Sequence, residues 1–252
     1  MCNILKTDKS LQSKLGKVYA VGVGPGSPKY VTDIVKEVVL KSHVVIGYKY
    51  TLKTIEHLIK GKDVVEVTMN NQEEAYQEIL SKLGDRTLVI PFTGDVNFSE
   101  SEVVDRLIEI FGNVEIIPGI SSIQVAAAKT KVPLDKSKVI TMHVTTSIEE
   151  KKLELQKALI DGFSVVLVPR PWPKQPDKHF MPSEIAMYLR KNGFNTKNMT
   201  VHVFEALTTE QEVSFIGKVN ELEGKEFSDL SVMVFNQAAL DSYMNYKWQW
   251  KN

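Results

Sequence analysis

Three short turns hold the residue types best suited to binding a small ligand. Each turn follows an apolar run, and the three are residues 22–26, 93–95 and 118–122. The first contains Pro25 among three glycines, the second carries the carboxylate of Asp95, and the third has adjacent hydroxyls on Ser121 and Ser122. Glycine lets a ligand approach the backbone, and the polar side chains supply hydrogen bonds. This set suits a small polar ligand that is not highly phosphorylated.

The first turn does not match the dinucleotide-binding fingerprint, which needs G-x-G-x-x-G after a strand and an acid about twenty residues later. Here the third glycine, Gly26, falls one place early. Pro25 also removes a backbone N–H from the turn that would hold a pyrophosphate. The second predicted strand ends at Gly47-Tyr48-Lys49 without an acid for the ribose, and the P-loop motif is absent. These features disfavour a nucleotide-binding oxidoreductase and a phosphotransferase.

Other common catalytic patterns are also missing. The five histidines have no H-x-x-x-H spacing, and Cys2 is the only cysteine, so the sequence predicts neither a metal site nor an intrachain disulfide. No G-x-S-x-G elbow occurs, and no base is identifiable for Ser121 or Ser122. A helix cap or a turn is therefore the more typical role for these serines.

The elements around the three turns predict an α/β fold. Short apolar strands alternate with amphipathic helices in the first half; the strands are expected at 18–23, 43–46, 63–67, 87–91 and 114–117, and the helices at 29–40, 51–60, 73–83, 100–111 and 123–129. This alternation indicates a parallel, doubly wound sheet. Ligands bind such sheets at the carboxyl ends of the strands, so the three turns are expected to converge there.

The second half is predicted to hold a mixed sheet, because helices are too few to connect all of its strands in parallel. Its strands are expected at 138–142, 164–168, 200–204, 212–216 and 231–235, and its helices at 149–160 and from 182 or 183 to about 193. We therefore expect an N-terminal extension (1–16), an N-terminal α/β domain (17–131), a link, a C-terminal α/β domain (137–240) and a tail (241–252). A proline-rich loop at 169–182 is either a solvated excursion or a binding loop.

Composition excludes several broad classes. The chain has 252 residues, 43% of them apolar, with 31 basic and 31 acidic side chains and a formal net charge of zero. Zero net charge argues against broad electrostatic binding of nucleic acid or a membrane surface. No stretch reaches the roughly 20 apolar residues of a membrane span. The first sixteen residues lack the apolar core of a signal peptide, so a cytoplasmic protein is expected.

Four segments resemble the motifs of the tetrapyrrole methylases. They are GVGPGSPKYVT, GYKYTL, FTGDVNF and IPGISSIQVAAAKTKVP, which occur in the family's order, and the resemblance covers about residues 17 to 236. It implies an S-adenosylmethionine-dependent methyltransferase of two α/β domains, usually a homodimer, with the cofactor in the cleft between the domains. Two departures are Val96, where the family usually has proline, and Val144, where a glycine follows the histidine.

Segments of the second half resemble the branch of the family that methylates C5 of the corrin ring in cobalamin biosynthesis. They are residues 138–143, 182–186 and 204–212. The resemblance implies a tetrapyrrole substrate, cobalt-precorrin-7 or a precorrin-6Y-type intermediate, and leaves open whether it carries cobalt. In some relatives a decarboxylating C15-methyltransferase follows on the same chain; here that activity is expected in a separate partner.

The resemblance also implies which residues line the sites. Those expected at the cofactor are Pro25, Asp95, Phe98, Ser121, Ser122, Leu167, Val168, Ala206 and Leu207. Arg170, Lys174 and Lys178 on the proline-rich loop would pair with substrate carboxylates. His143 would accept or shuttle a proton, although a lone histidine is more often structural.

Three alternatives remain open at this point. Within the family, methylation of another corrin carbon, or of a diphthine precursor on an elongation factor, would use the same turns. Outside it, a non-catalytic protein that binds a small ligand would use the same residues without transferring a methyl group. The disfavoured nucleotide-binding oxidoreductase is the third.

Overall fold

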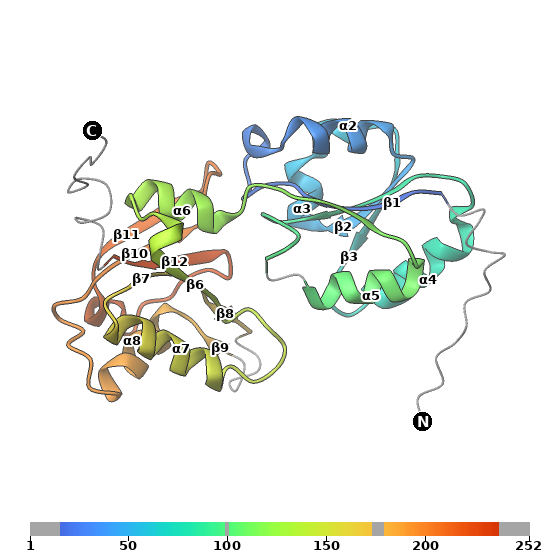
Figure 1. Ribbon diagram of the computed structural model, residues 1–252. Helices are drawn as coiled ribbons and strands as arrows, with labels where there is room; N and C mark the ends of the chain where they lie inside the picture. Colours follow the sequence, from blue (N-terminus) through green and yellow to red (C-terminus); the bar gives the residue numbers. More distant parts are fainter. Residues whose placement is uncertain (1–15, 99–100, 173–178, 237–252) are drawn as a thin grey trace, which may run out of the picture. The chain divides into compact units, whose positions relative to one another are not determined.

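The computed structural model describes residues 16–98, 101–172 and 179–236, which belong to two compact units (Figure 1). The first unit ends at Ser121 and the second begins at Ser122. The N-terminal extension and the C-terminal tail expected from the sequence lie outside the described residues. In the described part of the chain, no helix combines the length and the apolar character needed to cross a membrane.

The first unit contains a parallel sheet, as predicted. Its strands lie in the order β3-β2-β4-β1-β5, and all of the pairings between them are parallel. The strands are β1 (Val18–Gly22), β2 (Val44–Tyr48), β3 (Asp63–Val67), β4 (Leu88–Phe92) and β5 (Glu115–Ile117). The helices are α2 (Asp33–Lys41), α3 (Lys49–Thr54), α4 (Gln72–Leu83) and α5 (Ser101–Phe111), with short 3-10 helices η1 (Pro28–Tyr30) and η2 (Glu56–Leu58).

The inner strands β1, β2 and β4 are buried on both faces of the sheet, which explains why they are continuous apolar runs. Alternate residues of a strand point to opposite faces, so Ala20 of β1 packs in one core and Val21 in another. The Ala20 core includes Tyr76 of α4 and Leu107 of α5. The Val21 core includes residues of α2 and α3. Figure 1 shows α2 and α3 on one face of the sheet and α4 and α5 on the other, which confirms the doubly wound arrangement.

One predicted helix is interrupted. The pattern over residues 51–60 predicts a single helix, but α3 ends at Thr54 and η2 follows after Ile55. Thr54 and Ile55 are β-branched, which lowers their helix propensity. The Thr54 hydroxyl also donates to the carbonyl oxygens of Tyr50 and Gly26, at 3.1 and 3.2 Å. Helix α3 therefore ends at the residue whose side chain contacts the first glycine turn, Thr54.

The second unit contains the predicted mixed sheet, in the order β11-β10-β12-β7-β6. Only the β6–β7 pairing within it is parallel. The strands are β6 (Ser137–Thr141), β7 (Ser164–Val168), β10 (Thr200–Glu205), β11 (Val213–Lys218) and β12 (Ser231–Phe235); β8 (Arg170–Pro171) and β9 (His179–Phe180) form a separate small hairpin. The helices are α6 (Ser122–Thr130), α7 (Glu149–Ile160) and α8 (Pro182–Lys191), with 3-10 helices η3 (Leu134–Lys136) and η5 (Val219–Leu222).

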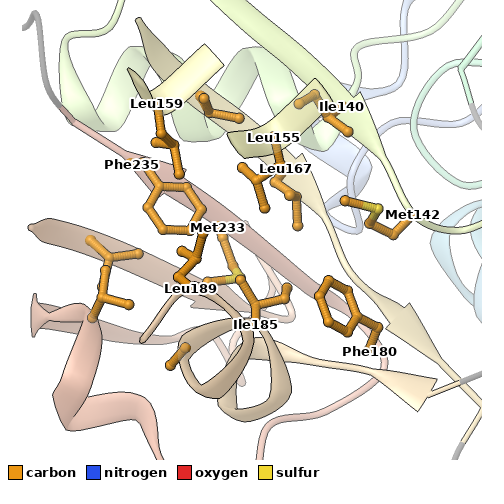
Figure 2. Packing of buried hydrophobic residues seen from close by; sticks show 14 of the residues in the cluster. Ile140, Met142, Leu155, Leu159, Leu167, Phe180, Ile185, Leu189, Met233 and Phe235 are labelled. Atoms are coloured by element: carbon orange, nitrogen blue, oxygen red, sulfur yellow. The ribbon is translucent and has the colours of Figure 1, made fainter. Parts of the chain in front are cut away.

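The core of the second unit lies between this sheet and the helices α7 and α8. Leu155 of α7 and Ile185 of α8 pack there against Leu167 of β7 and Met233 of β12 (Figure 2). Figure 1 shows α6 on the opposite face of the sheet, in contact with β12 and β7. Both faces of the second sheet are thus covered by helices.

Helix α6 belongs to the second unit, whereas the expected domain boundary at residues 132–136 would assign it to the first. The reason is its packing on β12 and β7. The side-chain amide of Asn236, just after β12, also donates to the carbonyl oxygen of Thr130 at 3.3 Å. Sequence pattern cannot reveal this, because a helix that follows a strand is compatible with either sheet.

Candidate functional site

The three turns predicted to converge do so at the carboxyl edge of the first sheet. Gly24, after β1, and Gly94, after β4, exchange backbone hydrogen bonds of 3.2 and 2.8 Å. Val23 extends the same pairing by donating its N–H to Phe92 at 2.9 Å. The backbones of the first two turns are therefore joined directly, and the prediction of convergence is confirmed.

The third turn packs so closely against the other two that only glycine fits. A Cβ atom added to Gly119 would lie 2.3 Å from the carbonyl oxygen of Gly94 and 2.4 Å from that of Gly22. A Cβ atom on Gly22 would lie 2.6 Å from the backbone nitrogen of Gly119. Because these neighbours are backbone atoms, they cannot move aside as a flexible side chain would. Gly94 is also left-handed, with φ of 72°.

Asp95 ties two of these turns together. Its Oδ1 accepts the backbone N–H of Asn97 at 2.7 Å, and its Oδ2 accepts the backbone N–H of Gly119 at 2.9 Å. The carboxylate therefore joins the turn after β4 to the turn after β5. Sequence reasoning singled out Asp95 as a ligand contact and missed this positioning role, because the Gly119 bond depends on the approach of the two turns.

The other first-unit residues expected at the cofactor lie around the same edge. Pro25 is buried beside Gly24, and Phe98 is partly exposed three residues after Asp95. Ser121 is buried at the end of the unit. The turns at one sheet edge therefore contain all four residues, Pro25, Asp95, Phe98 and Ser121. Their roles toward a ligand stay predictions.

The second-unit residues also gather at one sheet edge. Because β6, β7 and β10 run in the same direction, their carboxyl ends meet there. Leu167 and Val168 end β7, Ala206 and Leu207 follow β10, and His143 comes just after β6. The side chain of Leu167 points into the core (Figure 2), so only its backbone is available to a ligand. Ser122 opens α6, which packs on this sheet.

His143 lies against an aromatic ring that sequence reasoning did not single out. Its imidazole packs edge-to-face on Trp172, with ring centroids 5.0 Å apart, and its backbone N–H donates to Thr141 Oγ1 at 3.1 Å. Burial lowers the pKa of His143, the charge of Arg170 lowers it further, and Asp229 opposes both. The imidazole is therefore neutral near pH 7 and carries a lone pair able to accept a proton.

Arg170 is a buried cation without an acidic partner among the described residues. Its side chain and backbone together are 3% exposed, and its Nη2 donates to the carbonyl oxygens of Thr145 and Thr146 at 3.1 and 2.8 Å. The guanidinium lies 5.5 Å from the centroid of Trp172, and its Nε has no hydrogen-bond partner in the part of the chain that the structure describes. A buried charge in this state favours an anionic ligand. Lys174 and Lys178, expected beside it, lie outside the described residues.

The described residues include no group of three or more His, Cys, Asp and Glu side chains placed to hold a metal ion. The polar groups singled out from the sequence at the two edges include backbone turns and the Asp95 carboxylate in the first unit, and a neutral imidazole beside a buried guanidinium in the second. Such groups can bind, orient and accept a proton.

Comparison with known proteins finds the family model of the tetrapyrrole (corrin/porphyrin) methylases over residues 17–223. A probable cobalt-precorrin-7 C(5)-methyltransferase of Methanocaldococcus jannaschii is 29% identical over 222 residues, which cover 86% of this chain and 97% of the relative. A cobalt-precorrin-4 C(11)-methyltransferase of the same organism is 30% identical over 138 residues, 53% of each chain.

Solved structures share the fold. The methyltransferase CobJ superposes with a TM-score of 0.71 at 18% identity, covering 89% of this chain and 95% of that chain. A precorrin-6Y methylase from Archaeoglobus fulgidus superposes with a TM-score of 0.62 at 20% identity, covering 88% and 97%. At identities this low, the likeness to these structures shows a shared fold of two α/β units and no more.

Replacing Gly119 by alanine tests the packing of the three turns. We expect Gly119→Ala to lower the free energy of unfolding by about 3 kcal/mol or more, because its Cβ would overlap backbone oxygens. Gly61→Ala is the matched control in the same unit: Gly61 has φ of 79° but no atom near the added Cβ, so a loss of about 1–2 kcal/mol is expected. Denaturant unfolding measures both, and equal losses would contradict the packing described.

Acid sensitivity tests the environment of His143. Because folding lowers the pKa of His143, the unfolded chain binds protons first as the pH falls below about 6.5, and stability falls through that window. We expect His143→Gln to reduce the loss of unfolding free energy between about pH 7.5 and pH 5. Part of the pH dependence of unfolding free energy should remain in this variant, because burial also lowers the pKa of His202. A pH dependence of unfolding free energy that is unaltered by His143→Gln would refute the assignment.

Proposed function

The chain belongs to the tetrapyrrole methylase family, and from this premise we propose that it methylates C5 of a corrin-ring precursor in cobalamin biosynthesis. The methyl donor is S-adenosylmethionine, and the acceptor is cobalt-precorrin-7 or a precorrin-6Y-type intermediate. One observation carries the proposal: the match to the probable C(5)-methyltransferase spans 86% of this chain and 97% of that relative. The family's matched relatives are methyltransferases.

The residues at the first sheet edge suit this cofactor better than a phosphorylated one. Pro25 offers no N–H to a phosphate, and the carboxylate of Asp95 would repel one. A sulfonium compound with an amino group carries positive charge, which the same carboxylate attracts. We assign cofactor contacts to Pro25, Asp95, Phe98 and Ser121 of the first unit, and to Ser122, Leu167, Val168, Ala206 and Leu207 of the second.

The chemistry that S-adenosylmethionine supplies, when bound, is an electrophilic methyl group on sulfur. The protein's task is then chiefly to hold the acceptor carbon in line with that methyl group, and positioning of this kind lowers a barrier by roughly 7–11 kcal/mol. The rigid packing of Gly22, Gly94 and Gly119 supports this role, because it fixes the backbone that would contact the donor.

Two residues of the second unit would act on the tetrapyrrole. The guanidinium of Arg170 would pair with one of its carboxylates, which would give an acceptor to the Nε atom that has none among the described residues. The neutral imidazole of His143 would accept a proton released from the methylated carbon. We further propose that the enzyme works as a cytoplasmic homodimer.

Methylation of another corrin carbon is the second candidate. It is favoured by the partial match to the cobalt-precorrin-4 C(11)-methyltransferase, at slightly higher identity over a shorter segment. The two candidates share the cofactor turns and differ in the acceptor carbon.

Binding of S-adenosylhomocysteine, the demethylated product, tests the cofactor assignment. We expect the wild type to bind it in calorimetry and Asp95→Ala to bind at least about tenfold more weakly, a loss of about 1.4 kcal/mol. The reason is that the variant loses both a ligand contact and the bond to Gly119. Asp33→Ala, which removes an exposed carboxylate paired with Lys36, should bind like the wild type. Absence of binding by the wild type would refute the proposal.

A second experiment tests which carbon is methylated. Transfer of a labelled methyl group to the cobalt-precorrin, with the label located by NMR, separates C5 from other carbons.

The role of Arg170 has its own test. We expect Arg170→Gln to raise KM for the tetrapyrrole by about ten- to a hundredfold, which corresponds to the free energy of one charge-assisted hydrogen bond. The affinity for S-adenosylhomocysteine should not change. Arg190→Gln, which removes an exposed arginine paired with Glu223, is the matched control and should leave both unchanged. Steady-state kinetics with each substrate varied measures the effect. An unaltered KM in Arg170→Gln would exclude the proposed contact.

A further inference from the structure

The turn that follows β10 is held in a strained conformation. Ala206 and Thr208 both have positive φ, 47° and 71°. Such angles are unfavourable for residues with a Cβ atom, and most of all for a β-branched residue such as threonine. A strained turn persists only where its surroundings hold it, and such turns concentrate at ligand sites.

The carboxylate of Glu212 holds this turn. Its Oε2 accepts the backbone N–H of Thr208 at 2.7 Å, and its Oε1 lies 2.6 Å from the Nζ atom of Lys129. Within the turn, the hydroxyl of Thr209 donates to the carbonyl oxygen of Ala206 at 2.7 Å. Only 21% of the Glu212 side chain is exposed, so solvent screens these bonds incompletely.

Glu212 stays ionised in this setting. Burial raises the pKa of the carboxyl, but the hydrogen bonds from Lys129 and Thr208 and the charge of Lys129 outweigh burial and lower the pKa overall. The clamp is therefore charged at neutral pH.

Lys129 connects the clamp to a second segment. It stands in the last turn of α6, the helix that packs on β12 and β7 and begins at Ser122. The ion pair thus joins α6 to the turn that carries Ala206 and Leu207. Both segments contain residues that we assign to the cofactor.

We propose that Glu212, through Thr208 and Lys129, is a positioning residue that sets the geometry of the cofactor-binding turn at Ala206–Leu207. This inference rests on the proposed function. It differs from a role in stability alone, because the bond to Thr208 acts on the strained residue itself.

The test compares Glu212→Ala with Glu223→Ala. Glu223 is a matched control: it belongs to the same unit, pairs with Arg190 at 2.7 Å, and its side chain is 26% exposed. We expect Glu212→Ala to weaken S-adenosylhomocysteine binding at least tenfold in calorimetry, and Glu223→Ala to change it less than twofold. Amide hydrogen exchange at Thr208 should accelerate at least tenfold in Glu212→Ala only, with or without ligand.

Two milder variants keep the test decisive if Glu212→Ala folds poorly. Glu212→Gln retains an oxygen for the Thr208 N–H but loses the charge, and Lys129→Met removes the ion pair but leaves the Thr208 bond. Both are expected to bind S-adenosylhomocysteine more weakly than the wild type and more tightly than Glu212→Ala. The Thr208 amide should remain largely protected from hydrogen exchange in both.

The outcomes separate this inference from the proposed function. A wild type that does not bind S-adenosylhomocysteine would overturn the proposed function and this inference with it. A wild type that binds, together with Glu212 variants of unchanged affinity, would overturn the inference alone. Equal losses in Glu212→Ala and Glu223→Ala would also overturn it, because they would indicate a general effect on stability.

Discussion

The contact between the backbones of Gly22, Gly94 and Gly119 is the constraint on which the first unit's site depends. These residues come from turns far apart in the sequence, and a single added carbon at Gly22 or Gly119 would overlap backbone atoms. The approach is possible because the strands are parallel and their carboxyl ends meet at one edge. Asp95 completes it by accepting the N–H of Gly119. A backbone fixed in this way can hold a small molecule in one orientation, which is the main requirement of methyl transfer.

The second unit relies on electrostatics as well as on packing. Arg170 is buried with its guanidinium on Trp172 and with carbonyl oxygens as acceptors. Its charge contributes to lowering the pKa of His143, so the residue that we propose to bind a substrate carboxylate also influences the proton affinity of its neighbour. This pair of a neutral imidazole and a buried cation is the observation behind the proposal of an acidic substrate whose carbon loses a proton.

Strain and its compensation recur at these edges. Thr208 adopts a left-handed conformation, and Glu212 and Lys129 supply the hydrogen bond and the charge that hold it. In the first unit, the same conformation falls on glycines, at Gly24 and Gly94, where it carries no such penalty. The two units therefore reach defined turn geometry by different means: the absence of a side chain in one case, and a clamping carboxylate in the other.

The sequence by itself determined most of the elements, the parallel and mixed sheets, and the meeting of the three turns, but not the β8–β9 hairpin within the proline-rich loop. Apolar runs and the residues that end them act over a few positions, and parallel strands bring their carboxyl ends together by topology alone. The family motifs could also be read directly, because they lie in those turns. The interruption of the helix after Thr54 was not predicted, because the apolar residues keep helical spacing through this point. The effect of the β-branched pair Thr54 and Ile55 depends on a contact with Gly26 that only the fold provides.

Only the tertiary structure decided which sheet α6 covers, which backbone group Asp95 binds, and that Trp172 and Glu212 lie beside residues that we assign to the site. Each of these depends on a contact between distant segments: Thr130 with Asn236, Asp95 with Gly119, His143 with Trp172, Lys129 with Glu212. A residue's type indicates what it can bind, but the folded chain determines which partner lies within reach. For that reason Asp95 was singled out from the sequence for its carboxylate, while its bond to Gly119 could be seen only in the fold.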